Sequence, residues 1–92
     1  MSLAQNYPNP FNPTTTIDYR VAQDSGETIT LSIFDMLGRT VRTLVNEPAQ
    51  PGYYRILWDG RDDSGRMTGS GVYFYLLSDG QSRILQKMIK VQ

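Results

Sequence analysis

Apolar and polar residues alternate along this chain in short runs, and no run keeps the period of three to four residues that marks a helix. Alternation with a period of two is typical of a β-strand with one buried face. The runs are separated by turn-forming residues and cover residues 14–21, 28–35, 40–45, 53–58, 72–77 and 82–91. The pattern predicts an all-β fold, namely an immunoglobulin-like antiparallel β-sandwich of about seven short strands.

Two of these runs flank a polar connector and are expected to form the centre of the sandwich. In residues 53–58, Tyr54, Ile56 and Trp58 share one face, so that face can be buried. Residues 72–77 are apolar on both faces, which is typical of a central strand covered on both sides. The connector holds several glycines, which take positive φ without strain, and it predicts a loop that closes a hairpin.

The N-terminal segment is rich in proline. Residues 6–13 read Asn-Tyr-Pro-Asn-Pro-Phe-Asn-Pro, and the prolines fix φ and remove backbone donors, so neither a helix nor a central strand is expected. We expect Tyr7 and Phe11 to hold an extended lead-in against the sandwich, whereas a Pro-rich recognition ligand would be exposed throughout. The chain is therefore divided into a lead-in at residues 1–13 and the domain proper at residues 14–92.

Single residues predict the turns and the character of the last strand. Gly38 is expected to take positive φ in a tight turn. Pro48 and Pro51 lie within residues 46–52 and predict a loop that interrupts pairing. Residues 82–91 carry apolar and polar groups on both faces, which predicts an edge strand with a bulge or a mixed environment.

Length and charge limit the classes of function. Ninety-two residues make one domain, and a domain of this size buries only about 60 to 65% of its unfolded surface. Nine acidic and nine basic residues give a net charge of zero, so no basic field is present to bind nucleic acid. The sequence has no His and no Cys, which removes the usual nucleophile–base pairs, disulfides and thiolate metal sites. Neither an enzyme nor a cofactor is expected.

The sequence also lacks the patterns of membrane insertion. No apolar run approaches the roughly 20 residues that span a bilayer. The N-terminus has no charged region followed by an apolar stretch, as a secretory signal peptide would. The chain reads as a domain excised from a longer protein, and an export signal of that protein would lie elsewhere in it.

A cluster of carboxylates in the connector is a weak candidate for a calcium site. Asp59, Asp62 and Asp63 lie close together in sequence, and calcium binds loops of carboxylate and carbonyl oxygens. The spacing differs from an EF-hand loop, and Arg61 and Arg66 offset the local charge. The alternative is that these aspartates cap turns by accepting hydrogen bonds from loop amides.

Aromatic residues are frequent enough to raise a carbohydrate-binding function. A carbohydrate-binding module would present an exposed, flat row of rings that stack on sugars. The candidate rings are Tyr53, Tyr54, Trp58, Tyr73 and Tyr75. The alternation of their strands favours a position in the core for most of them.

Several motifs together resemble a known family. They are residues 3–17 (Leu-Ala-Gln-Asn-Tyr-Pro-Asn-Pro-Phe-Asn-Pro-Thr-Thr-Thr-Ile), residues 33–39 (Ile-Phe-Asp-Met-Leu-Gly-Arg), Pro51-Gly52, Trp58-Asp59-Gly60, Gly71-Val72-Tyr73 and residues 87–91 (Lys-Met-Ile-Lys-Val). In this order they resemble the type A C-terminal sorting domain of type IX secretion substrates, a relative of the immunoglobulin-like domain of flagellar hook-capping proteins. The resemblance covers nearly the whole chain.

The resemblance implies a non-catalytic secretion signal. The parent protein would enter the periplasm by a conventional signal peptide and then cross the outer membrane through the type IX translocon, to be secreted or held at the cell surface. In many relatives a sortase cuts ahead of the domain and attaches the parent to a surface lipopolysaccharide. The implied partners are the translocon, the sortase and the parent domain in cis, without nucleic acid and without an integral membrane segment.

We hypothesise that Gly71, Tyr73, Lys87 and Lys90 mark the surface that the translocon reads, because the last strand offers an edge to which a partner strand can add. The alternatives are a turn glycine, a core ring, and lysines that protect an edge from aggregation. Two other functions stay open for the whole domain. It would then be a carbohydrate-binding module or a structural spacer in a multidomain surface enzyme.

Overall fold

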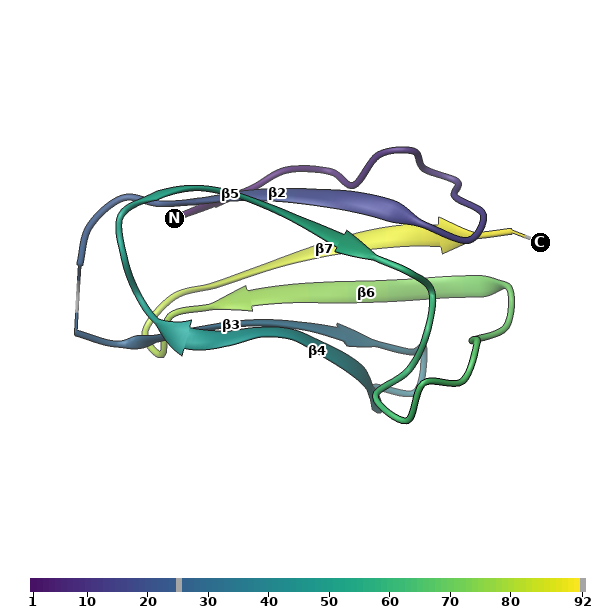
Figure 1. The fold of residues 1–92 in the computed structure, drawn as a ribbon. Helices are drawn as coiled ribbons and strands as arrows, with labels where there is room; N and C mark the ends of the chain where they lie inside the picture. Colours follow the sequence, from purple (N-terminus) through teal and green to yellow (C-terminus); the bar gives the residue numbers. More distant parts are fainter. Residues whose placement is uncertain (25, 92) are drawn as a thin grey trace.

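The computed structural model describes residues 1–24 and 26–91, and within them seven strands form two antiparallel sheets (Figure 1). The strands are β1 (Ser2–Leu3), β2 (Thr15–Val21), β3 (Thr28–Phe34), β4 (Thr40–Pro48), β5 (Gly52–Trp58), β6 (Gly71–Ser78) and β7 (Arg83–Lys90). One sheet has the order β1-β2-β5 and the other β4-β3-β6-β7. The predicted all-β, immunoglobulin-like sandwich is confirmed. Among the described residues no helix is long and apolar enough to cross a membrane.

The predicted central hairpin is wrong, because its two strands belong to different sheets. β5 pairs with β2, whereas β6 lies between β3 and β7. The connector at residues 59–70 therefore crosses from one sheet to the other (Figure 1). It is longer than the loops of two to about five residues that usually close hairpins. β6 is central in its sheet, as predicted, but only its inner face is covered.

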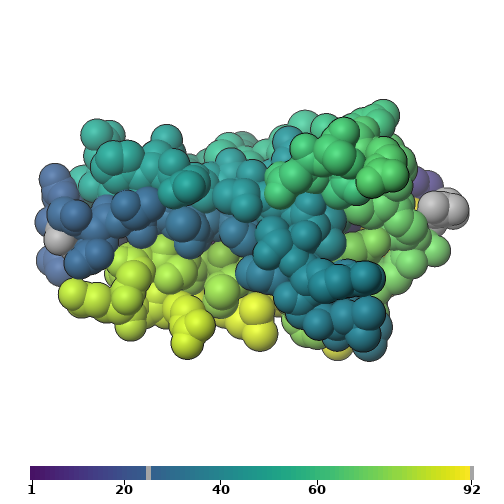
Figure 2. Space-filling model, turned by 90° about the horizontal axis from the view of Figure 1, so that it is seen from below, coloured from purple at the N-terminus to yellow at the C-terminus, as the bar shows by residue number. Residues whose placement is uncertain are grey.

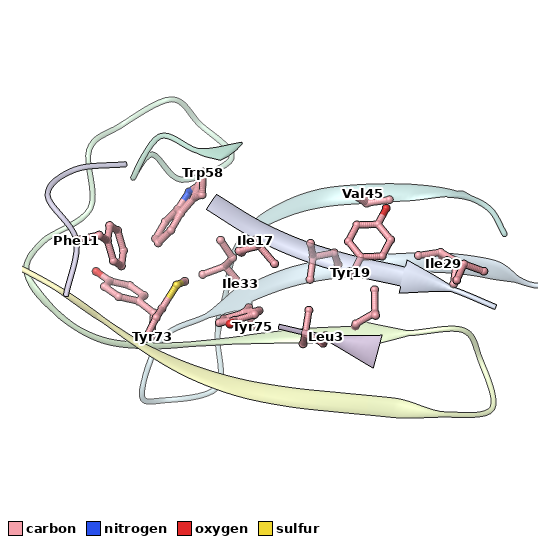
Figure 3. Close-up of a cluster of buried hydrophobic side chains, with 14 of the residues drawn as sticks. Leu3, Phe11, Ile17, Tyr19, Ile29, Ile33, Val45, Trp58, Tyr73 and Tyr75 are labelled. Carbon is pink, nitrogen blue, oxygen red and sulfur yellow. The ribbon is translucent and has the colours of Figure 1, made fainter. Parts of the chain in front are cut away.

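The core lies between the two sheets and is built from the inward residues of both (Figure 3). At one end Trp58 packs edge-on against Tyr73, with ring centroids 5.6 Å apart, and Phe11 lies 5.6 Å from Trp58 on another side. Tyr19 stacks on Tyr54 at 5.0 Å. Aromatic pairs in such geometries stabilise a core beyond the area that they bury.

The lead-in is an integral part of the sandwich. Ser2–Leu3 forms β1 against β2, and the side chains of Leu3 and Phe11 are buried in the core. The expectation that Phe11 holds the lead-in is confirmed, and an exposed Pro-rich ligand does not describe this segment. Tyr7 instead lies on the outside, where its hydroxyl donates to Asp18.

The two edge strands of the larger sheet are β4, which is longer than expected, and β7. β4 continues to Pro48, which pairs with Thr28 at the end of the ladder. Proline is tolerated there because β4 has no neighbour on its other side. β7 is an edge strand of mixed polarity, as predicted, but its ladder with β6 is regular, and the register shifts occur between β3 and β4 instead. Figure 2 shows β3 and β4 side by side, and the turn around residue 37 that joins them stands out from the body of the molecule.

Candidate functional site

The four residues predicted to be recognised all lie on the β6–β7 ladder. Gly71 pairs with Lys90 at one end, and Tyr73 and Lys87 lie in successive pairs further along. Strand alternation nevertheless divides them between two faces. Gly71, Tyr73 and Lys90 lie on the inner side, where Tyr73 and Lys90 are buried and Gly71 is exposed at the end of its strand, whereas Lys87 alone lies on the outside and is exposed. The four residues therefore do not form one continuous exposed surface.

Lys90 is 98% buried, which is unusual for a lysine. Its Nζ donates a hydrogen bond of 2.7 Å to the Thr68 carbonyl. Tyr73 makes a parallel contact one residue further on, because its hydroxyl donates to the Gly69 carbonyl, also at 2.7 Å. Tyr73 and Lys90 thus anchor the connector against the end of the sandwich, and their position explains them without a partner.

The connector packs so closely that it requires a glycine at position 60. Gly60 is buried with φ of +83°, and a Cβ there would lie 2.8 Å from the Pro13 carbonyl oxygen and 3.1 Å from Lys90 Cε. The Thr68 amide and hydroxyl donate to the Gly60 carbonyl, and Trp58 Nε1 donates to the Arg61 carbonyl. The connector is therefore an ordered part of the fold that covers Trp58.

Two of the three aspartates of the connector, Asp59 and Asp62, cap its turns, and Asp63 holds the connector to β4. Asp62 Oδ1 accepts the amides of Ser64 and Arg66 and the Ser64 hydroxyl, and these hydrogen bonds, the hydroxyl foremost, lower its pKa. Asp59 accepts the Arg61 amide and pairs with Arg42 at 3.3 Å. Asp63 accepts the Thr43 amide. The part of the chain that the structure describes contains no group of three His, Cys, Asp or Glu that could hold a metal ion. The calcium candidate is not carried further.

The five candidate rings do not form an exposed row. Trp58, Tyr73 and Tyr75 are buried, and Tyr54 is half-buried against Tyr19. Tyr53 alone of the five is fully exposed, with 83% of its surface accessible. Their interpretation as core residues is therefore confirmed for most of them, and a flat platform for sugars is not present in this set.

The sequence did not indicate a buried polar network that joins the lead-in to the core. The Asn6 amide group donates to Thr15 Oγ1, and the Asn6 backbone N–H donates to the Tyr75 hydroxyl. That hydroxyl in turn donates to the Ala4 carbonyl. Asn6 and Thr15 are both buried. Thr15 falls on the inward side of the predicted 14–21 strand together with Ile17, whereas Asn6 lies in a polar, Pro-rich segment. No local pattern distinguishes Asn6, because its partner Tyr75 lies 69 residues away.

The lead-in also covers half of the β7 edge. The Phe11 amide donates to the Ile89 carbonyl, the Val91 amide donates to the Phe11 carbonyl, and Asn9 Oδ1 accepts the Ile89 amide. Gln5 Nε2 donates to the Lys87 carbonyl. The edge to which a partner strand was expected to add is thus already occupied near the C-terminal end of β7. It is open only in the first half of the strand.

Comparison with known proteins gives one family and several similar folds. The profile of the FlgD Ig-like domain matches residues 9–80. No curated protein matches the chain. Among solved structures, PorU in its dimeric latent form from Porphyromonas gingivalis has a TM-score of 0.70 at 24% identity, over 95% of this chain and 9% of PorU.

Two further structures have the same fold. PorZ, described as an essential bacterial surface component of the type-IX secretion system of Porphyromonas gingivalis, has a TM-score of 0.66 at 22% identity, over 96% of this chain and 11% of PorZ. FlgD from P. aeruginosa has a TM-score of 0.57 at 22% identity, over 83% of this chain and 59% of that protein.

This chain therefore spans only a part of each of these proteins, about a tenth of PorU and PorZ and somewhat more than half of FlgD. At these identities the structures establish the fold, and the family follows from the profile, which covers most of the chain. The protein belongs to the family of FlgD Ig-like domains.

Proposed function

We propose that this domain is a non-catalytic sorting module, carried by an exported protein and recognised by the type IX secretion machinery. One observation carries the proposal: 96% of this chain is similar in fold to a small part, 11%, of PorZ, a surface component of that system. The resemblance of the opening, the Trp58-Asp59-Gly60 segment and the last strand to type IX sorting domains supports the same function. The parent protein would pass through the periplasm and reach the cell surface or the medium.

A non-catalytic function agrees with the chemistry of the chain. The sequence has neither His nor Cys, so nucleophilic catalysis by the usual pairs has no residues to use. The carboxylates of the connector accept hydrogen bonds from loop amides or from the Thr43 amide of β4, and Asp59 pairs with Arg42. Recognition of the folded surface by another protein is therefore the better-supported activity.

Lys87 and Lys90 make a matched pair that separates recognition from folding. Lys87 is exposed on the outside of β7, whereas Lys90 is buried and holds the connector. A deletion of residues 87–92 would also remove Met88 from the core, so it would reduce export simply by unfolding the domain. A point substitution at the exposed Lys87 avoids this ambiguity.

The experiment fuses a fluorescent reporter with an inner-membrane signal peptide to the N-terminus of this domain, in hosts with and without a working type IX translocon. The expected result is reporter at the surface or in the medium of the first host alone. Lys87→Ser is expected to lower export while the fold, followed by circular dichroism of the purified domain, stays intact. Retention in the periplasm of both hosts would overturn the proposal and leave a spacer module as the better account.

A further inference from the structure

The outside of the larger sheet carries an apolar patch centred on β6. We call its members the outer apolar face: Val72, Phe74 and Leu76 of β6, Leu85 and Ile89 of β7, and Phe34 at the end of β3, whose other outward residues are Thr28, Thr30 and Ser32. Val72, Phe74 and Leu76 of β6 lie at its centre and are half-buried by their neighbours alone. On β7, Leu85 is 58% exposed and Ile89 is 37% exposed. No described segment forms a third layer over this face, so large apolar groups stay in contact with water.

The outer apolar face contains a shallow hollow beside the 35–39 turn. It has a volume of about 280 Å³ and is lined mainly by Phe34, Met36, Phe74, Leu76 and Leu85. The turn that carries Met36 is held by Asp35, whose side chain accepts the amides of Leu37 and Arg39. Figure 2 shows this blue-green turn standing out on the side where the yellow-green β6–β7 strands lie. The turn is thus a fixed wall beside the sheet.

The charges on this face have one sign. Strand alternation places Arg83 and Lys87 on the outside of β7, and neither has an ion pair within the described residues. Asp35 pairs with Arg39, and Asp79 accepts the amides of Gln81 and Ser82. Two unpaired cations therefore lie beside the apolar surface, while the nearby carboxylates are used within their own turns.

This charge pattern decides what kind of molecule fits. A second copy that docked face to face would bring Arg83 and Lys87 toward the same cations, and like charges in an interface cost affinity. A segment that carries carboxylates next to large apolar side chains would satisfy both the cations and the hollow. We propose that the outer apolar face binds such an acidic, apolar segment of a partner protein. The inference holds for this surface whether or not the domain is an export signal.

The test uses the 92-residue chain labelled with 15N and three synthetic peptides of equal length. The first combines Leu and Phe with Glu, the second replaces Glu with Lys, and the third replaces Leu and Phe with Ser. The first peptide is expected to shift the amide resonances of β6, β7 and the 35–39 turn in a saturable manner. The second and third are expected to shift them weakly or not at all.

Variants connect the binding to particular side chains. Lys87→Glu should weaken binding of the first peptide by about tenfold or more, because it reverses a charge that faces the ligand. Leu85→Ser should weaken it by several-fold, because it removes apolar surface from the hollow. Leu57→Ser is the matched control, since Leu57 is similarly exposed at 62% but lies on the other sheet, and it should leave binding unchanged.

Three outcomes would overturn the proposal. Shifts confined to β2 and β5 would place the binding surface on the other sheet. Equal binding of the acidic and basic peptides would leave only non-specific apolar contact. Shifts of the β6 and β7 resonances that grow with the concentration of the unliganded chain would show that a second copy, not an acidic partner, covers this face.

Discussion

The two sheets of this sandwich bury similar inner faces but present different outer faces. On the smaller sheet, Asp18 pairs with Arg55 at 3.0 Å and accepts the Tyr7 hydroxyl, and the Arg20 guanidinium lies 5.6 Å from the centre of the Tyr53 ring. These contacts tie exposed side chains into a polar layer. On the larger sheet, the outward residues of β6 and β7 are mostly apolar, and the cations of β7 are unpaired.

The difference between the two sheets shows that the fold requires an apolar inner face but does not require an apolar outer face. Both sheets obey the same alternation and meet in one core, so an inward apolar row is enough to form each of them. The polar layer over β2 and β5 shows that this fold tolerates a solvated outer face. The apolar outside of β6 is therefore not a requirement of the sandwich, and binding of another protein is a better reason for it.

If the two sheets differ only on their outer faces, the free energy of unfolding should depend mainly on the side chains packed between the sheets. On β5, Trp58 points inward and is fully buried, whereas Tyr53 points outward and is exposed. Trp58→Ala should lower the free energy of unfolding by about 3 to 5 kcal/mol, through lost burial and a cavity. Tyr53→Ala should change it by less than about 1 kcal/mol. Urea unfolding followed by circular dichroism measures both, and comparable losses would contradict the division into inner and outer residues.

The next largest effect on the free energy of unfolding should come from substitutions in the connector that joins the two sheets. Gly60→Ala should lower the free energy of unfolding by about 2 to 3 kcal/mol, because a Cβ would meet the Pro13 carbonyl at 2.8 Å and φ is +83°. Gly65→Ala is the matched control. Gly65 also has positive φ, at +90°, but a Cβ there meets nothing within 4 Å, so the cost should be about 1 kcal/mol. Equal costs in thermal unfolding would mean that the close packing of the connector is unimportant.

The polar outer face should respond to pH. The hydrogen bonds from Arg55 and Tyr7 lower the pKa of Asp18 in the folded protein, the bond from Arg55 being the larger cause. Its contribution should be fully present above the unfolded pKa, near pH 4, and should be lost as the pH falls through the lower folded pKa.

The size of this contribution should be below about 1 kcal/mol, because the pair is partly exposed. The measurement compares the free energy of unfolding of the protein and of Asp18→Asn from pH 7 to pH 3. The difference between them should shrink toward pH 3. A difference that stays constant over this range would show that the ionised carboxylate contributes nothing.

The smallest effect on stability should come from the outer apolar face. Leu85→Ser should change the free energy of unfolding by no more than about 0.5 kcal/mol, because the side chain is mostly exposed. The same variant should bind the acidic, apolar peptide more weakly. A large loss of stability without a change in binding would show that this face is structural and would remove the contrast between the two sheets.

Local patterns in the sequence were sufficient to predict most strands and turns. Alternation located six of the seven strands to within a few residues, and Gly38 takes the positive φ that its turn required, at +82°. The alternation of apolar and polar residues also indicated that most aromatic side chains are in the core. Strand positions, turns and the inward faces of strands depend on residues close together in the chain, so the local sequence is enough to predict them.

Features that depend on distant residues were missed or misplaced. The 53–58 and 72–77 runs were expected to pair, but their partners are β2 for the first and β3 and β7 for the second. Alternation places Lys87 and Lys90 on opposite faces of the last strand, but it does not say that Lys90 is the one buried beneath the connector. Asn6 gave no signal of its contact with Tyr75.

The sequence by itself determined that this chain forms short antiparallel strands, that it has neither His nor Cys, and that its motifs resemble one family of domains. The tertiary structure alone decided which strands share a sheet, which of two lysines can meet a partner, and that the second apolar face of β6 stays uncovered. The physical reason is that alternation defines two faces of a strand, whereas the layer that covers each face comes from residues far away in the chain.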